Sequence, residues 1–360
     1  MTNQINTTFL QATSQKHTLQ FKQASGTSRG ILRIKESWFI VIKNSKTWEW
    51  GIGECGLLKG LSIDDRPDYE EKLKEVCDNI SKINYWLEEG LREFPSIQFG
   101  LEMAWKSYQS KNKYELFPSE FTKGKQSIPI NGLVWMGDKD FMRQQIEDKI
   151  NQGFDCVKMK IGAIDFETEI ALLQNIRKRF SKDAIELRVD ANGAFQPGEN
   201  ALQKLNVLAK LDIHSIEQPI KQGKLEEMKE LCCKTPLPIA LDEELIGVFE
   251  KEKKSELISF IQPQYIILKP SLIGGFKGSQ EWIDAAAKYD IPWWITSALE
   301  SNIGLNAIAQ WTFTLDNSMH QGLGTGSLYT NNFPSPLCVK NGAIHYDDEG
   351  EWDLSLLNED

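Results

Sequence analysis

The chain has 360 residues, of which 41% are hydrophobic and 26% are charged, and it carries a formal net charge of -10. This charge would repel phosphate backbones and anionic lipid surfaces, so we expect neither a nucleic-acid nor a membrane partner. The first ten residues lack the basic start and apolar run of a signal peptide, and no stretch is apolar enough to span a membrane. We therefore expect a cytoplasmic protein.

The first third of the chain has the pattern of a mixed α+β domain, which we expect to cover residues 1–124. Residues 38–42 and 46–53 predict two strands around a turn, and residues 69–91 and 96–110 predict helices. The glycine pattern GIGECG at 51–56 follows a hairpin and precedes no good helix, so a dinucleotide site is not favoured.

From residue 128 onward, eight short apolar runs recur at intervals of 24 to 30 residues, beginning near residues 128, 155, 185, 213, 237, 265, 291 and 319. Helical segments separate them, such as residues 165–180, where Asp165 can cap the start. This alternation predicts parallel strands, and eight of them can close a barrel. We therefore expect an α/β fold with a modified (β/α)7β TIM-type barrel over residues 125–328. Residues 329–360 contain no further βα unit and are expected to return to the first domain.

Three acidic residues end consecutive strands of the predicted barrel: Asp190, Glu217 and Asp242. A single acid at such a place often faces solvent or caps a helix. Three together would repel one another unless a cation lies between them. Carboxylates without histidine or cysteine favour Mg²⁺, with Mn²⁺ as a substitute. Glu243 follows Asp242 directly and is the alternative third ligand.

Three lysines also stand at strand ends. Lys158 and Lys160 are two residues apart and so share one face of their strand, while Lys269 comes from the sixth strand, across the barrel mouth. Lone lysines of this kind are usually solvated. Beside a metal ion, the neighbouring positive charges would lower a lysine pKa and let the amine accept a proton. The combination predicts removal of the proton next to a metal-bound carboxylate.

The motifs KMK (158–160), DAN (190–192), EQP (217–219), DE (242–243) and KPS (269–271) together resemble the muconate-lactonizing branch of the enolase superfamily. The stretch GIGECGLLKGLS at 51–62 is similar to the loop of the capping domain in that branch. Within the branch, IPINGLVWMG, FGLEMAW and ITSALESNIG resemble the o-succinylbenzoate synthases of menaquinone biosynthesis.

This resemblance implies a hydro-lyase that converts 2-succinyl-6-hydroxy-2,4-cyclohexadiene-1-carboxylate to 2-succinylbenzoate by syn dehydration. It implies that Asp190, Glu217 and Asp242 bind Mg²⁺ and that Lys160 acts first as base and then as acid. Lys269 would face the opposite side of the ring as a cation, and Lys158 would support the enediolate. The residues expected to bind the substrate are Ser297, Thr296, Asn192, Gly324, Thr325, Leu58 and Ser62.

Other functions remain open at this point. A dipeptide epimerase or N-acylamino acid racemase could use the same two lysines on opposite faces of a carbon atom. Dipeptide epimerases often carry an Asp-x-Asp element near the eighth strand, and MHQGLGTG at 319–326 has no acid. A catalytically silent binding protein and a Schiff-base aldolase built on Lys269 are further alternatives, and the aldolase gives the acids no task. The sequence does not decide between a monomer and a homo-oligomer.

Overall fold

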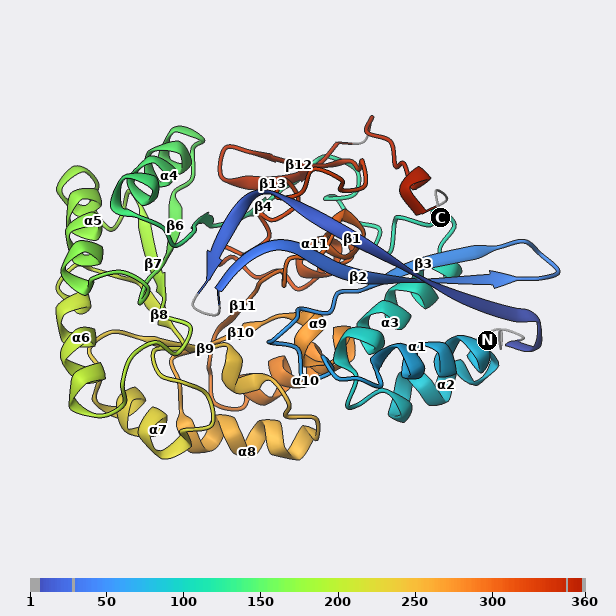
Figure 1. Ribbon diagram of the computed structural model, residues 1–360, viewed down its shortest axis with the longest axis horizontal. Coiled ribbons are helices and arrows are strands. Elements are labelled where there is room, and N and C mark those ends of the chain that lie inside the picture. Colours follow the sequence, from blue (N-terminus) through green and yellow to red (C-terminus); the bar gives the residue numbers. More distant parts are fainter. Residues whose placement is uncertain (1–6, 28–29, 348, 358–360) are drawn as a thin grey trace.

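The computed structural model describes residues 7–27, 30–347 and 349–357. The start of the chain, where we expect no signal peptide, lies partly outside these residues. Figure 1 shows a curled parallel sheet with helices around its outside and two antiparallel sheets beside it. Within the described residues, no helix is both long and apolar enough to cross a membrane.

The N-terminal sheet has three antiparallel strands, and three helices follow it. They are β1 (Leu10–Thr27), β2 (Gly30–Asn44), β3 (Trp50–Cys55), α1 (Tyr69–Asp78), α2 (Ile83–Tyr85) and α3 (Pro95–Gln109). The two predicted strands are present, but β2 is longer than expected. Strand β1 was not predicted, because its sequence LQATSQKHTLQFKQASGT is mostly polar and has no clear apolar alternation. Strand β1 is extended because it pairs with β2 over most of its length.

The glycines of GIGECG serve packing between β3 and α3. An added Cβ at Gly53 would lie 2.0 Å from the carbonyl oxygen of Gly100, and one at Gly51 would lie 2.2 Å from the backbone nitrogen of Tyr108. Only glycine allows the strand and the helix to approach this closely. The pattern therefore has a structural reason that needs no dinucleotide.

Seven parallel strands form the wall of the barrel, in the order β11-β10-β9-β8-β7-β6-β5. They are β5 (Gly132–Val134), β6 (Cys156–Lys160), β7 (Glu186–Asp190), β8 (Ser215–Glu217), β9 (Ile239–Leu241), β10 (Tyr265–Leu268) and β11 (Trp293–Ile295). The helices between and after them are α4 (Lys139–Asn151), α5 (Phe166–Arg179), α6 (Glu199–Ala209), α7 (Leu225–Lys234), α8 (Lys251–Ile261), α9 (Pro270–Ile273), α10 (Gly275–Ala287) and α11 (Asn302–Thr314). The predicted α/β barrel is confirmed, and the Asp165 carboxylate caps α5 by accepting a hydrogen bond from the backbone of Thr168.

The eighth apolar run is not a regular strand, which corrects the prediction of eight strands. It closes the barrel through single bridges, in which Gln321 pairs with Ile130 and Gly322 pairs with Thr296. The backbone nitrogen of Gly322 donates to the carbonyl of Ile295 at 2.7 Å. Glycines at alternate positions of GLGTG leave few side chains to pack, so this segment lacks a longer ladder.

The C-terminal segment forms a small antiparallel sheet of β4 (Ile128–Pro129), β12 (Leu337–Lys340) and β13 (Ala343–Tyr346). Strand β13 pairs with β4, at the start of the predicted barrel range. Further along, Trp352 stacks on Tyr114 with ring centroids 4.7 Å apart. The boundaries at residues 124 and 328 stay a prediction.

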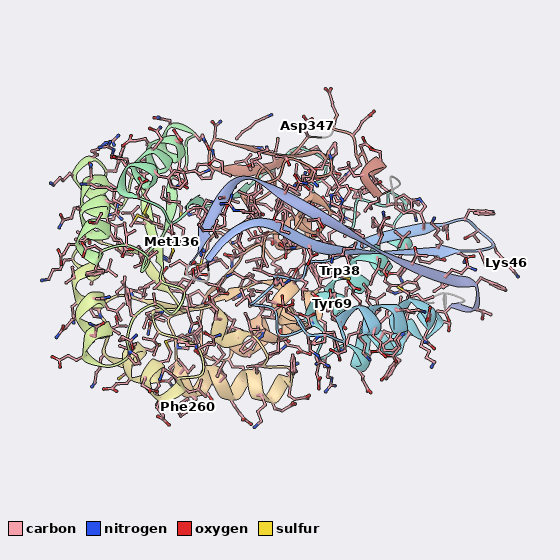
Figure 2. The ribbon with its side chains drawn as sticks, in the orientation of Figure 1. Trp38, Lys46, Tyr69, Met136, Phe260 and Asp347 are labelled. Carbon is pink, nitrogen blue, oxygen red and sulfur yellow. The ribbon has the colours of Figure 1, made fainter. Side chains whose placement is uncertain are left out.

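The hairpin of β1 and β2 extends from the N-terminal helices across to the barrel, as Figure 1 shows. Near its end, Gly26 pairs with Met136, which Figure 2 labels beside the tip of the hairpin. Nearer the middle of β2, Trp38 packs against Tyr69 of α1 with ring centroids 5.0 Å apart. The hairpin thereby brings residues of the first domain to the mouth of the barrel.

A buried carboxylate links α3 to the barrel helix α10. Glu102 accepts hydrogen bonds from the backbone nitrogens of Phe276 and Lys277, at 2.5 and 3.3 Å. Burial raises its pKa from the ordinary value of 4.5 to about 7. The folded protein thus binds this proton more tightly than the unfolded chain. The stabilising contribution is complete below about pH 4.5 and is lost as the pH rises through about 7.

We therefore expect the free energy of unfolding to fall between pH 5.5 and 8, with Glu102 accounting for about 2 kcal/mol. Urea titrations at both pH values would measure this fall. Asp64, whose pKa burial raises to about 6, contributes in the same direction, so the comparison with Glu102→Gln isolates Glu102. An equally steep fall in Glu102→Gln would contradict the assignment.

Candidate active site

The three predicted acids converge at the C-terminal end of the barrel. Asp190 ends β7 and pairs in register with Glu217, which ends β8, and Asp242 follows β9 directly. Their exposed fractions are 0%, 2% and 2%. Parallel strands bring their carboxyl ends to one rim, and the apolar strands around the acids keep water away. Carboxylates buried this deeply need positive partners.

The three predicted lysines lie against these acids. Lys158 and Lys160 alternate with buried apolar residues on β6, so both reach the barrel interior. The Nζ atom of Lys158 lies 2.7 Å from Glu217 and 3.5 Å from Asp190. The structure therefore joins the second, third and fourth strands through ion pairs.

The other two amines stand at opposite ends of the row of acids. Lys160 Nζ donates to Asp190 at 2.9 Å and to the side-chain oxygen of Asn192 at 2.7 Å. Lys269 Nζ lies 3.3 Å from Glu217 and also forms an ion pair with Asp242. This places one amine on either side of the carboxylates, as the sequence predicts.

The pKa values of two of the three acids are shifted in opposite directions. Burial raises the pKa of Asp242 well above its ordinary value, and the nearby charges of Glu243 and Glu217 add to the rise. Burial also opposes ionisation of Glu217, but Lys158 and Lys269 outweigh it and hold the pKa of Glu217 well below its usual range. Asp242 and Glu217 are close enough that each shifts the pKa of the other. A divalent cation between these carboxylates would favour their ionised forms, and an all-oxygen donor set fits Mg²⁺.

In the absence of a cation, the carboxylates raise the pKa of two of the lysines. Burial lowers the pKa of Lys158, but Glu217 and Asp190 outweigh it and raise that pKa above its ordinary value. Burial likewise opposes the charge of Lys269, yet Asp242 and Glu217 raise its pKa. The cause is that the carboxylates face the ammonium groups directly. Lowering therefore requires a cation that competes for the same oxygens.

The neighbours of Asp242 favour it over Glu243 as the third metal ligand. Glu243 accepts a hydrogen bond from the side-chain nitrogen of Asn192 at 3.0 Å, whereas Asp242 contacts Glu217 and Lys269. Glu244 is held by the backbone of Gly223 at 2.8 Å. Asn192 thus connects Lys160 to Glu243 and holds both in place.

A cavity of about 250 Å³ opens above this cluster. Most of the residues predicted to bind the substrate line it: Asn192, Thr296, Ser297, Gly324, Thr325 and Leu58. Ser62 does not line the cavity, which corrects that prediction. Its hydroxyl instead accepts a hydrogen bond from the backbone of Leu58 at 2.8 Å and so shapes the loop.

Sequence reasoning missed several residues of the cavity wall. Asn131 lines the cavity, and its buried Oδ1 atom has no hydrogen-bond partner among the described residues. Asn131 lies directly before β5, so a search for polar residues at the C-terminal ends of strands does not find it. Leu133, Trp135 and the hairpin residues 30–32 add apolar surface. The signal that could have marked this place is an asparagine directly before Gly132, at the start of a strand.

A second polar cluster lies at the opposite end of the barrel. Atoms of Cys156, Glu186 and His320 that could bind a metal all lie within 4.8 Å of one another. Their spacing in the sequence gave no sign of it. The Nε atom of Arg188 lies 2.6 Å from Glu186 and already supplies positive charge there. We infer that this cluster serves structure.

The comparisons with known proteins agree with this geometry. A family model described as enolase C-terminal domain-like matches residues 141–350. The chain is 45% identical to an o-succinylbenzoate synthase from Desulfotalea psychrophila, over 91% of this chain and 96% of that protein. The chain belongs to the o-succinylbenzoate synthase family of the enolase superfamily.

Two solved structures share the fold of this chain. The crystal structure of MenC from Desulfotalea psychrophila has a TM-score of 0.82 and 41% identity, and it covers 93% of this chain and 99% of its own. A dipeptide epimerase from Enterococcus faecalis, solved with Mg and L-Leu-L-Tyr, has a TM-score of 0.78 and 20% identity, covering 93% and 96%. The second likeness shows the fold alone.

Proposed function

We propose that the chain dehydrates 2-succinyl-6-hydroxy-2,4-cyclohexadiene-1-carboxylate to 2-succinylbenzoate, with Mg²⁺ as cofactor. The observation that carries the proposal is the row of three buried carboxylates flanked by Lys160 and Lys269, in a chain of this family. The enzyme is a hydro-lyase of menaquinone biosynthesis. Its substrate is a small carboxylate, which suits a cavity of this size.

The acids supply the place for the ion. Asp190, Glu217 and Asp242 would hold Mg²⁺ through carboxylate oxygens, in exchange for the ammonium contacts described above. When bound, the ion draws charge from the substrate carboxylate, acidifies the adjacent carbon and stabilises the enediolate. The lysines then have less negative charge to neutralise, which lowers the cost of their neutral form.

The lysines perform the proton transfers. Neutral Lys160 removes the proton from the ring carbon that carries the carboxylate, and the same nitrogen returns it to the departing hydroxyl on the same face. Water leaves, and the ring becomes aromatic. The hydrogen bond from Lys160 to Asn192 directs the amine. Lys269, on the other side, stays charged beside the ring face, and Lys158 supports the developing negative charge.

The wall of the cavity suits a ring with a succinyl arm. Leu58 from the first domain and Leu133 and Trp135 from the barrel give apolar surface, while Thr296 brings a buried hydroxyl with no partner among the described residues. Apolar walls with a few fixed polar groups are usual for small-molecule sites. They also exclude water from the proton transfers.

The dehydration assay tests the proposal directly. We expect purified protein with Mg²⁺ to convert the cyclohexadiene to 2-succinylbenzoate, as followed by ultraviolet absorbance and mass spectrometry. Dipeptides and N-succinylamino acids are tested in parallel in D₂O, with deuterium at the α-carbon as the readout. Deuterium uptake without dehydration would replace the proposal by the epimerase or racemase alternative.

A further inference from the structure

A buried glutamate that carries no role so far lies behind the cavity. Glu300 follows β11, and its exposed fraction is 0%. The hydroxyl of Ser297 donates to Glu300 Oε2 at 2.5 Å, and the hydroxyl of Ser271 donates to Oε1. Both oxygens of the carboxylate are thus engaged by serines next to the cavity and next to Lys269. A carboxylate can only accept hydrogen bonds.

The hydroxyl of Ser297 is fully engaged. It donates its one hydrogen to Glu300 and accepts from the backbone nitrogen of Leu299 at 3.1 Å and from the Thr325 hydroxyl at 2.8 Å. A serine oxygen has one hydrogen and two lone pairs, so none is left for a ligand. Ser297 is among the residues expected to bind the substrate, and in this structure its hydroxyl has no hydrogen left to donate to one.

The directions of these hydrogen bonds determine which atoms Thr325 presents to the cavity. The Ser297 hydroxyl donates to Glu300, so its oxygen accepts the hydrogen bond from the Thr325 hydroxyl. Thr325 lines the cavity, and its hydroxyl hydrogen is therefore turned away from that cavity. We propose that Glu300 is a positioning residue that fixes the direction of the hydrogen bonds from Thr325 to Ser297 and from Ser297 to Glu300, together called the relay. Thr325 then offers the cavity a hydrogen-bond acceptor, which binds a substrate hydroxyl rather than a carboxylate. For the proposed diene, on whose assignment this inference rests, the donor is the ring hydroxyl.

Thr296 differs from Thr325 in this respect. Its hydroxyl oxygen is buried and has no hydrogen-bond partner among the described residues, so no bond recorded there fixes its direction. The protein therefore orients the hydroxyl of Thr325 and leaves that of Thr296 without such a bond. In this arrangement Thr325 accepts from a hydroxyl. Lone pairs that face a carboxylate are repulsive, which directs the substrate arms to other walls.

A matched pair of unreactive ligands tests the relay: 2-succinylbenzoate and its 6-hydroxy derivative. Calorimetric binding is measured with Mg²⁺ at pH 8, because burial raises the pKa of Glu300 although Lys35 opposes the rise. We expect the wild type to bind the hydroxylated ligand about tenfold more tightly, the size of one net hydrogen bond.

Four variants separate the relay from a general effect on the cavity. Thr325→Val removes the acceptor, and Ser297→Ala and Glu300→Ala release its orientation, so all three are expected to lower the preference below about twofold. Thr325→Ser is expected to keep it. The readout is the ratio of the two affinities in each variant, because a general effect on the cavity weakens both ligands alike. If Glu300→Ala does not fold, Ser297→Ala and Thr325→Val carry the test.

The inference is overturned if the wild type shows no preference, if Thr325→Val keeps it, or if both ligands weaken equally. Neither ligand reacts, so this result is independent of turnover. A protein that prefers the hydroxylated ligand but does not dehydrate the diene would refute the proposed function and leave the relay standing.

Discussion

Replacing Lys160 with alanine is expected to lower kcat of the dehydration by about 1,000-fold or more, because one amine serves as both base and acid. Lys269→Ala is expected to lose a similar factor, since the charge opposite Lys160 would be gone. In the structure these amines contact opposite ends of the row of acids, Asp190 on one side and Asp242 on the other. The measurement is kcat from the absorbance assay.

Two controls accompany the lysine variants. Both should bind 2-succinylbenzoate with Mg²⁺ at near wild-type affinity, which separates lost chemistry from lost folding. Lys253→Ala changes an exposed lysine on α8 and should leave kcat unchanged. Turnover within tenfold of the wild type in Lys160→Ala would remove the mechanism.

The second large effect concerns the metal. EDTA is expected to abolish turnover, added Mg²⁺ to restore it, and Mn²⁺ to substitute. Asp190→Asn, Glu217→Gln and Asp242→Asn should each raise the Mg²⁺ concentration needed for half-maximal activity by at least about 100-fold, because each removes a charged ligand oxygen. Titration of activity with Mg²⁺ gives this number.

Glu243→Gln is the matched control for the third ligand. Glu243 is as buried as Asp242 and adjoins it, yet it contacts Asn192. We expect its Mg²⁺ requirement to change only a few-fold. A large change in Glu243→Gln together with a small one in Asp242→Asn would exchange the two roles.

The sequence predicted the positions of site residues where a regular backbone fixes the direction of their side chains. A repeat of apolar runs predicts parallel strands, and parallel strands bring their ends together, so Asp190, Glu217 and Asp242 could be placed at one rim before any coordinates. The same alternation put Lys158 and Lys160 on one face. These inferences depend on period and register, which a sequence contains.

The rest depends on contacts between distant segments. Strand β1 gains its order from pairing with β2, and the eighth segment gains its place from single bridges on both sides, so neither has a strong local signal. The direction of the bond from Thr325 to Ser297 depends on Glu300, and the raised pKa of Lys269 depends on acids from other strands. Ser62 faces its own loop because a backbone nitrogen four residues earlier needs a partner.

A crystal structure with Mn²⁺ and 2-succinylbenzoate would test the central claim most directly, through the anomalous signal of the metal. The account predicts one strong peak about 2.1 Å from oxygens of Asp190, Glu217 and Asp242, with the ring between Lys160 and Lys269. A peak elsewhere, for example beside Cys156 and His320, or a ring with both lysines on one face, would contradict it.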